Sequence, residues 1–188
     1  MKISHNVFGN NLVFETSNSL FSFKSADKGT LFMLQNCSIN QDEIVLDLGC
    51  GYGLVGIACA KVADSVNVTM CDIDPVAVEY ARKNLQLNQI TNANVIQSNA
   101  YENIEQKDFT LILSNPPYHA DFSVPKEFIE KGYRKLVPNG RMLMVTKRLE
   151  WYKRKFIAVF GGVKIFRCDD YFVFMGIKKS KNKENIHI

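Results

Sequence analysis

Apolar and polar positions along the chain fall into blocks that predict strands and helices in alternation. Apolar runs, some continuous and some alternating, predict five central strands at 44–48, 66–73, 94–97, 109–113 and 141–146. Segments with apolar residues at helical spacing predict helices at about 28–37, 54–62, 75–87, 125–137 and 150–160. Strands that alternate with helices indicate right-handed βαβ units and a mostly parallel sheet.

Further β segments are predicted near both ends of the chain. Up to about residue 23, short apolar pieces alternate with Asn, Gly and Ser clusters, which is typical of a small hairpin. The runs 163–168 and 171–177 are separated only by two aspartates, so they predict an antiparallel hairpin at the sheet edge. The pattern therefore predicts an α/β protein with a Rossmann-like, seven-stranded, mostly parallel sheet, a C-terminal antiparallel hairpin and a short N-terminal β-hairpin extension.

A glycine-rich turn follows the first central strand. The segment 44–57, IVLDLGCGYGLVGI, has the order strand, turn and helix. Glycine lets the backbone turn sharply and approach a ligand, and the next helix offers free N–H groups there. Gly51, Gly53 and Gly56 match the G-x-G-x-x-G dinucleotide fingerprint, which is a weak signal on its own. Asp47 precedes the glycines, where its carboxylate can face an ammonium group, and this favours a nucleotide-like cofactor other than a nicotinamide.

Four polar residues lie at predicted ends of strands, namely Asp47, Asp72, Asn99 and Asn115. These ends meet at one edge of a parallel sheet, where ligands bind, so we expect the four side chains to line one site. Asp72 can accept both hydroxyls of a ribose, and Ile73 behind it can pack against an adenine. Asp74 is explained by local structure instead, since Asp is a good N-cap and Pro75 fits the first helical position.

A second motif, Asn115-Pro116-Pro117-Tyr118, lies at the end of the fourth predicted strand. Its adjacent prolines remove two backbone donors and stiffen the chain. The Asn115 side-chain oxygen and the Pro116 carbonyl can then accept both protons of a planar NH₂ group and orient the nitrogen lone pair. Tyr118 can stack on a planar substrate. The neighbouring His119 could take up the released proton, but a solvent-exposed loop histidine is equally expected.

Taken together, DLGCGYG at 47–53 and NPPY at 115–118 resemble the motifs of class I S-adenosylmethionine-dependent methyltransferases, of the branch that modifies amino groups. The resemblance narrows with FSF at 21–23 and DKGT at 27–30, and with the continuation of NPPY into HAD. These segments are similar to the methyltransferase small domain family, and the similarity covers nearly the whole chain. The resemblance implies the Rossmann-like fold of a class I methyltransferase.

By resemblance, the cofactor is S-adenosylmethionine and its product is S-adenosylhomocysteine. The segment before the glycine motif packs over the methionine end, with Phe21, Lys28, Gly29 and Thr30. The glycine motif and the strand ends complete the implied cofactor site, with Asp47, Gly49, Cys50, Gly51, Gly53, Asp72, Ile73, Asn99, Ala100 and Asn115. Asn99 replaces the family's usual acidic residue, but its oxygen can still accept and the Ala100 N–H can donate. The implied catalytic set is 115–118, and no metal or covalent nucleophile is needed, because the sulfonium is an activated methyl donor.

Assigned members of the family mostly methylate the exocyclic N2 of guanine in ribosomal RNA, so the resemblance implies this substrate. The NPPY motif itself specifies only a planar NH₂ group. A protein glutamine amide, adenine N6, a small-molecule amine and a cofactor-binding module without catalysis therefore stay as alternatives. Asp121 also departs from the family's glycine, and the well-known guanine enzymes carry an additional N-terminal domain that helps to bind RNA. RNA recognition is then expected from the chain's own basic residues, from a homodimer partner or from another protein.

Length and composition are consistent with this interpretation. The 188 residues are expected to form one domain, with a β extension at 1–23, a catalytic core at 24–178 and a basic tail at 179–188. With 46% apolar and 22% charged residues the composition is typical of a globular protein, and neither a membrane span nor a signal peptide is expected. The five cysteines form no C-x-x-C pair, which predicts buried thiols and a reducing cytoplasm.

The net charge of +4 is mild, but basic residues become more frequent late in the chain. They are Lys147, Arg148, Lys153, Arg154, Lys155, Lys178, Lys179, Lys181 and Lys183. This distribution predicts either a solvated helix face with a frayed tail or a phosphate-binding surface. The second interpretation fits an RNA partner, either ribosomal RNA or a ribosomal subunit.

Overall fold

The computed structural model describes residues 1–18, 20, 26–62, 64–117 and 121–180. The strands of its main sheet are β3 (Ile44–Leu48), β4 (Asn67–Asp72), β5 (Ala93–Gln97), β6 (Phe109–Ser114), β7 (Leu136–Thr146), β8 (Lys164–Cys168) and β9 (Tyr171–Ile177). They lie in the order β5-β4-β3-β6-β7-β9-β8. Strands β3 to β7 run parallel to one another, while β9 pairs antiparallel with both β7 and β8. The predicted sheet and its C-terminal antiparallel hairpin are therefore confirmed.

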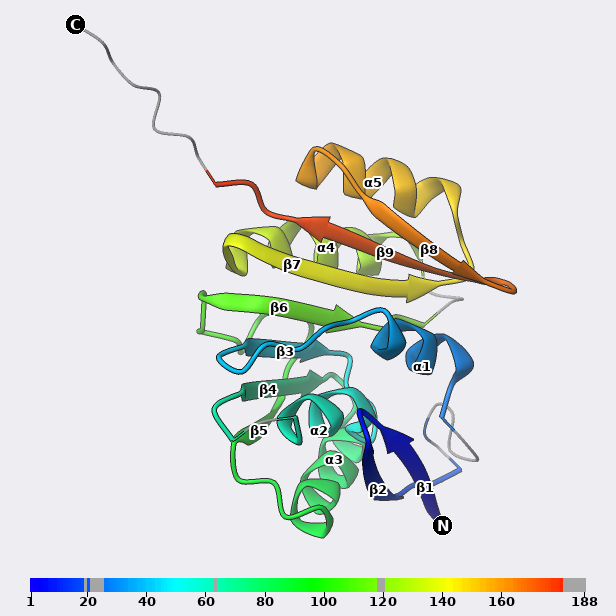
Figure 1. Ribbon diagram of the computed structural model, residues 1–188, viewed down its shortest axis with the longest axis vertical. Coiled ribbons are helices and arrows are strands. Elements are labelled where there is room, and N and C mark those ends of the chain that lie inside the picture. The colour runs from blue at the N-terminus through cyan, green and yellow to red at the C-terminus, as the bar shows by residue number, and fades with distance from the viewer. Residues whose placement is uncertain (19, 21–25, 63, 118–120, 181–188) are drawn as a thin grey trace, which may run out of the picture.

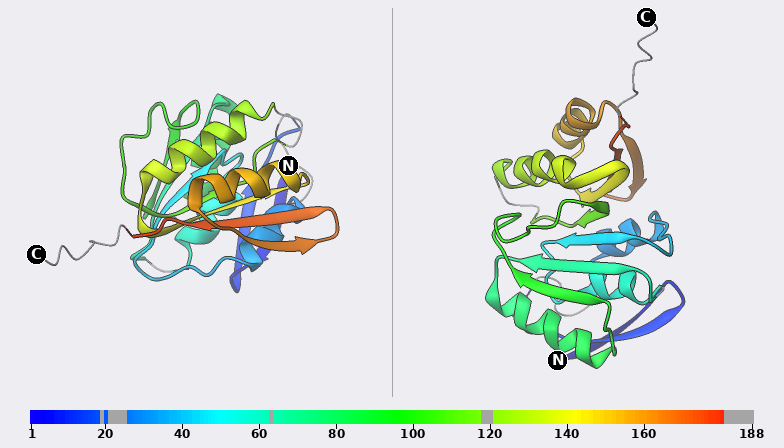
Figure 2. Two further views of the ribbon diagram at one scale, coloured as in Figure 1. Left: turned by 90° about the horizontal axis from the view of Figure 1, so that it is seen from above. Right: turned by 90° about the vertical axis from the view of Figure 1, so that its left-hand side faces the viewer.

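Helices cover both faces of this sheet and make a three-layered molecule (Figures 1 and 2). Their bounds are α1 (Lys28–Gln35), α2 (Leu54–Ala60), α3 (Pro75–Leu87), α4 (Ser123–Lys135) and α5 (Glu150–Phe160). The strands point side chains alternately into two cores: Val45 packs with α1, α2 and α3, whereas Leu46 packs with α4 and α5. Among the described residues, no helix combines the length and the apolar character needed to cross a membrane.

One stretch is predicted as the wrong type of element, at the start of β7. The helix that the sequence pattern extends to residue 137 ends at Lys135, and Leu136 already pairs with Phe109 of β6. The next parallel pair joins Leu111 and Arg141, so the residues between form a bulge inside the strand and not a turn before it. A Cβ on Gly140 would lie 2.9 Å from the carbonyl oxygen of residue 137, which explains the glycine in this bulge.

The predicted N-terminal hairpin consists of β1 (Lys2–Val7) and β2 (Asn10–Glu15) and packs on α3. Two asparagines, Asn84 in α3 and Asn88 at its C-cap, attach it by hydrogen bonds that imitate strand pairing. Asn88 accepts from the Val13 N–H at 3.0 Å and donates to the Val13 carbonyl at 2.7 Å. Asn84 does the same with the backbone of Glu15, and it also donates to the Tyr52 carbonyl in the glycine turn at 2.8 Å. The hairpin is thus linked through α3 to the turn.

An Asn84→Ala variant is expected to lose about 2 kcal/mol of unfolding free energy. Its side chain is fully buried, and most of this loss comes from the Tyr52 carbonyl, which would remain buried without its donor. The backbone groups of Glu15 contribute less because water can reach them. Urea unfolding measures the effect, with Asn94→Ala on the exposed side of β5 as the matched control. Equal stability of the two variants would contradict this account of the hairpin.

Candidate functional site

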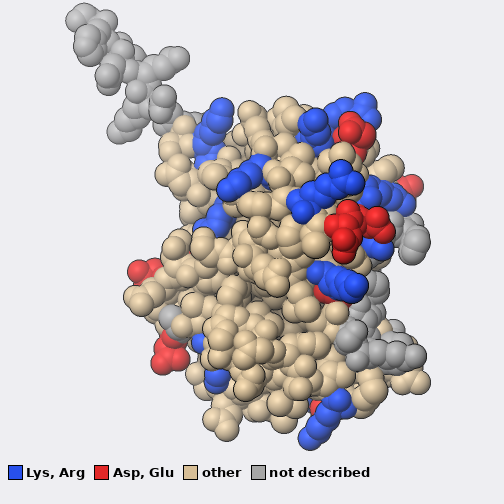
Figure 3. All heavy atoms as spheres, turned by 45° about the vertical axis from the view of Figure 1, so that its right-hand side comes forward, with Lys and Arg blue, Asp and Glu red and all other residues tan. Residues whose placement is uncertain are grey.

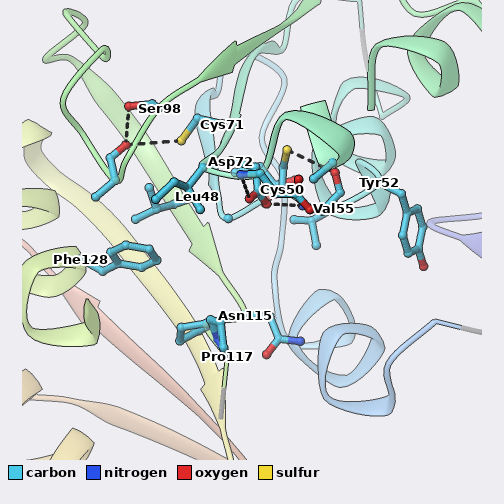
Figure 4. A pocket seen from close by; sticks show the side chains of 18 of the residues that line it. Leu48, Cys50, Tyr52, Val55, Cys71, Asp72, Ser98, Asn115, Pro117 and Phe128 are labelled. Carbon is cyan, nitrogen blue, oxygen red and sulfur yellow. Dashed lines mark hydrogen bonds between the residues drawn. The ribbon is translucent and has the colours of Figure 1, made fainter. Parts of the chain in front are cut away.

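A cavity of about 440 Å³ opens where the strands of the parallel sheet end (Figure 4). Its lining contains most of the site residues that the sequence predicts, namely Thr30, Asp47, Gly49, Cys50, Gly51, Asp72, Ile73, Asn99, Ala100, Asn115, Pro116 and Pro117. The four polar residues at the strand ends therefore come together in one cavity. Figure 4 shows Asp72 and Cys50 on one side of this space and Asn115 with Pro117 on another.

Three predicted cofactor residues do not line the cavity. Lys28 is exposed in the first turn of α1. Gly29 packs against Tyr171, and a Cβ added there would lie 2.4 Å from the tyrosine ring. Gly53, at a φ of 95°, precedes α2 and packs against Ala81 of α3. Outside the described residues lie Phe21, Tyr118 and His119.

Asp72 fixes the glycine turn against the end of β4. One carboxylate oxygen accepts from the Gly51 N–H at 2.8 Å and the other from the Asp74 N–H at 3.0 Å. Gly49 and Gly51 have φ values of 76° and 55°, which a residue with a side chain rarely adopts. A carboxylate has about four acceptor positions, so Asp72 can accept two further bonds, as a pair of ribose hydroxyls would require.

Asp47 is a buried carboxyl group at the floor of the cavity, with 2% of its surface exposed. Burial raises its pKa to about 7, and the nearby charge of Asp72 acts in the same direction. A hydrogen bond of 2.8 Å from the Gly56 N–H, in the first turn of α2, partly opposes this rise. An ammonium group in the cavity would favour the ionised form, because a buried carboxylate is stable only with a cation or several donors beside it.

The Asn115 amide is held in one orientation. Its nitrogen donates to the Asp27 carboxylate at 3.1 Å and to the Thr30 hydroxyl at 2.8 Å. Its oxygen is buried and has no hydrogen-bond partner among the described residues. Figure 4 shows the nitrogen turned towards α1 and the oxygen away from it. Because both partners of the nitrogen can accept, this orientation leaves the oxygen of a cavity-lining amide as a free acceptor for an N–H group.

Asp27 is a polar residue of the cavity lining that the sequence analysis does not single out as a site residue. Its carboxylate caps α1 through the Thr30 N–H at 3.0 Å, and it accepts from the Tyr171 hydroxyl at 3.1 Å as well as from Asn115. An aspartate just before a helix predicts a cap. Nothing in the local sequence predicts the contact with Asn115, which is 88 positions away. Asp27 thus connects α1, β9 and the end of β6 at the cavity.

The remaining walls of the cavity are mainly apolar. They include Leu48, Tyr52, Val55, Val124 and Phe128, none of which the sequence singles out as a site residue. Ile73 is 62% exposed beside Asp72, as a residue that packs on a planar ring would be. Burial and the charges of Asp47 and Asp72 hold the pKa of the Cys50 thiol well above its usual range, so this thiol is not a nucleophile.

The loop after β5 supplies hydrogen-bonding groups at the rim. The Ser98 hydroxyl donates to the Ala100 carbonyl at 2.9 Å and accepts from the Asn103 N–H, which holds Ala100 at a φ of 49°. Asn99 is exposed, and its amide nitrogen donates to Glu102 at 3.1 Å, so its oxygen is left to accept. The cavity therefore offers groups for an ammonium ion, a ribose, an adenine and an N–H donor, which is the set that S-adenosylmethionine and an amine acceptor need.

Comparison with known proteins agrees with this geometry. A model of the methyltransferase small domain matches residues 11–175. Ribosomal RNA small subunit methyltransferase C of Psychromonas ingrahamii is 33% identical over 150 residues, which are 78% of this chain and 42% of that protein. The uncharacterised protein YbxB of Bacillus subtilis is 31% identical over 139 residues, covering 72% of this chain and 68% of YbxB.

Among solved structures, the 16S rRNA N2 methyltransferase RsmC of T. thermophilus, in complex with AdoMet and guanosine, has a TM-score of 0.87 and 24% identity. The similarity covers 95% of this chain and 50% of RsmC. The chain spans about half the length of the curated rRNA methyltransferases that it matches. At this identity the structural likeness establishes the fold.

Proposed function

The chain belongs to the methyltransferase small domain family, and on this basis we propose that it transfers the methyl group of S-adenosylmethionine to the exocyclic N2 of guanine in ribosomal RNA. The observation that carries the proposal is the buried oxygen of Asn115, a cavity-lining residue, which has no hydrogen-bond partner in the described part of the chain. The names of the relatives, which are ribosomal RNA methyltransferases, support the choice of RNA. An activity of this kind belongs in the cytoplasm.

We assign the cofactor to the half of the cavity formed by β3, β4 and β5. S-adenosylmethionine brings an activated methyl group on a sulfonium to this site. Asp47 would hold its ammonium group and Asp72 its ribose hydroxyls, while the exposed Ile73 packs on its adenine. The Asn99 oxygen and the Ala100 N–H would recognise the adenine edge. Each of these groups has the charge or the free hydrogen-bonding capacity that its role requires.

We assign the acceptor amine to the other half of the cavity, at the end of β6. The Asn115 oxygen accepts one proton of the planar NH₂ group, and the Pro116 carbonyl accepts the second. These two bonds fix the plane of the amine and therefore the direction of its lone pair. They also strengthen as positive charge develops on the nitrogen, which lowers the barrier to transfer. Tyr118 would stack on the guanine, as its place in the motif predicts.

The proposed domain organisation is one unit, with the hairpin as part of the catalytic body. The contacts of Asn84 and Asn88 with the hairpin support this, because they join it to the helix beside the glycine turn. Residues 24–178 form the proposed catalytic core. A second copy of the chain, or another protein, remains a candidate for completing the RNA surface.

The pKa of Asp47 makes cofactor affinity depend on pH. Since the raised pKa of about 7 means that a proton occupies Asp47 below that value, this proton must leave before the carboxylate can pair with an ammonium group. The affinity for S-adenosylhomocysteine is therefore expected to rise about fifteenfold in all between about pH 5.5 and 7, with a slope that decreases towards the pKa. Above this range the ligand's own amino group begins to titrate. Calorimetry in buffers of different ionisation enthalpy measures the proton released on binding.

An Asp47→Asn variant serves as the control for this linkage. It is expected to bind the ligand more weakly at neutral pH and to lose the pH dependence, because an amide does not titrate. An unchanged pH profile in the variant would show that another group is responsible, and the assignment of Asp47 to the ammonium would then be wrong.

Transfer of labelled methyl from S-adenosylmethionine tests the proposed substrate class. The acceptors are ribosomal subunits, their stripped RNA and total protein, all from cells that lack this chain. We expect label in the RNA fractions. Label in protein would instead assign the chain to glutamine methylation, and label in neither fraction would contradict a macromolecular substrate.

A further inference from the structure

A stack of planar side chains lies outside the cavity, and the proposed chemistry makes no use of it. The rings of Phe122 and Trp151 are stacked with their centres 4.6 Å apart and their planes at 21°. The Arg148 guanidinium lies over the Phe122 ring at 4.8 Å. Phe122 is 37% exposed although it is fully apolar. We call these three residues the stacking platform.

The stacking platform adjoins the acceptor half of the cavity. Phe122 directly precedes α4, and Val124 and Phe128 of this helix line the cavity. Arg148 follows the end of β7, the parallel neighbour of β6, and Trp151 lies in the first turn of α5. These positions share one edge of the sheet with Asn115. The cofactor half, formed by β3, β4 and β5, lies on the other side of β6 in the sheet.

Some basic side chains of the late segments are used inside the fold. Lys155 forms an ion pair with Glu130 of α4, and Lys178 donates to the Leu136 carbonyl at 2.6 Å. These two therefore do not belong to a phosphate-binding surface, contrary to one interpretation of the sequence. The other interpretation, that these lysines lie on a solvated helix face or in a frayed tail, does not describe them either, because each has a specific partner in the fold.

Other basic side chains stand on aromatic rings near the sheet edge. The Lys147 ammonium lies 4.8 Å from the centre of the Tyr171 ring. Arg167 lies over Phe172 and Lys164 over Phe166, on the hairpin of β8 and β9. Figure 3 shows Lys and Arg side chains gathered over the upper half of one face, with fewer acidic groups among them. Cations beside partly exposed aromatic planes fit a ligand that carries both phosphates and bases.

Two acidic residues lie beside the stacking platform. Asp121 accepts from the Ser123 N–H at 2.7 Å, directly before α4. Glu150 lies beside Trp151 in the first turn of α5, where a negative charge favours the helix. Their carboxylates offset part of the positive charge, so the stacked aromatic rings and the Arg148 guanidinium over Phe122 are the distinguishing features of this surface.

We propose that the stacking platform binds a nucleotide next to the target base in single-stranded RNA, an inference that rests on the proposed function. A base whose amino group is methylated has to leave its stack, and the neighbouring base then loses a stacking partner. The aromatic and guanidinium planes of the platform replace that partner. Lys147, which precedes Arg148 and lies over the Tyr171 ring, neutralises a phosphate of the same strand. An acidic protein segment would use the cations but would have no use for the aromatic planes.

Trp151 makes the proposal directly measurable, because it is the only tryptophan in the 188 residues. Titration with a short, unpaired RNA of mixed sequence at constant salt is expected to quench its fluorescence as bases stack on the platform. A Phe122→Ala variant is expected to bind this RNA about tenfold more weakly, with reduced quenching. Ile157→Ala is the matched control, since Ile157 is an apolar residue of α5 that is 44% exposed. Unchanged S-adenosylhomocysteine affinity in both variants shows that they are folded.

Two further ligands separate the contribution of the bases to binding from that of the negative charges. Inorganic polyphosphate has phosphates but no bases, and we expect it to compete with the RNA without quenching Trp151. RNA that binds equally well to the Phe122→Ala variant and leaves Trp151 unquenched would overturn the proposal, and so would quenching by an acidic peptide at the same affinity. The readout is RNA binding and is therefore independent of methyl transfer. If RNA is methylated but Trp151 is not quenched and Phe122→Ala binds RNA normally, only this inference is refuted. If Trp151 is quenched but no RNA is methylated, the proposed function is refuted.

Discussion

Replacing Asn115 by alanine is expected to slow methyl transfer about 10²- to 10³-fold while S-adenosylmethionine affinity stays within about threefold. The amide oxygen is a buried acceptor without a partner among the described residues, so its loss removes the bond proposed to orient the amine. The cofactor groups on β3, β4 and β5 are untouched. Single-turnover transfer at saturating cofactor measures the first effect, and calorimetry measures the second.

Asn99→Ala is the matched control for this experiment, since it removes an amide on the cofactor side of the same cavity. We expect the opposite result there, with weaker cofactor binding and an unchanged transfer rate at saturation. Full transfer by the Asn115→Ala variant would contradict the role assigned to Asn115.

Replacing Asp27 by alanine is expected to lower the transfer rate by about 10²-fold, because Asp27 holds the Asn115 amide in its orientation. The Asn115 amide would then be held by Thr30 alone and would be free to turn its oxygen away. Asp27→Asn is expected to recover most of the rate. Its amide oxygen can accept from Asn115 and Thr30, and its amide nitrogen can donate to the Tyr171 hydroxyl. Transfer rates at saturating cofactor and RNA measure this series.

Loss of the helix cap is a separate effect of Asp27→Ala, worth about 1 kcal/mol of stability. Asp74→Ala controls for it, because Asp74 caps α3 through the Val76 N–H in the same way but does not touch Asn115. We expect both variants to lose similar stability in urea unfolding and only Asp27→Ala to lose transfer. A parallel loss of transfer in Asp74→Ala would reduce the role of Asp27 to that of a cap.

Elements with strong local signals follow from the sequence. The helix Pro75–Leu87 has the predicted bounds, because an aspartate N-cap and a proline at the first position both act within one turn. The strand Ile44–Leu48 and the helix Glu150–Phe160 are likewise as predicted from their apolar spacing. The convergence of Asp47, Asp72, Asn99 and Asn115 also follows, since it depends only on the ends of parallel strands meeting at one edge.

Features that depend on distant partners do not follow from the sequence. Leu136 belongs to β7 because Phe109 pairs with it across the sheet, and its own neighbours favour a helix. Asp27 acquires its role from Asn115 and from Tyr171, which is 144 positions away. Lys155 does not belong to the basic surface, because it forms an ion pair with Glu130 of another helix. Each of these contacts exists only after the sheet has brought separate segments together.

The nucleoside that carries the methyl group is the most direct test of the central claim, which is that Asn115 presents an acceptor to a planar exocyclic amine. Ribosomal RNA methylated by the wild-type chain would be digested to nucleosides and analysed by mass spectrometry. The account predicts N2-methylguanosine with the wild type and with Asn99→Ala at saturating cofactor, and its near absence with Asn115→Ala. A methyl group on a ribose 2′-oxygen or on a ring carbon would contradict it, because neither acceptor has a planar NH₂ group for the Asn115 oxygen to hold.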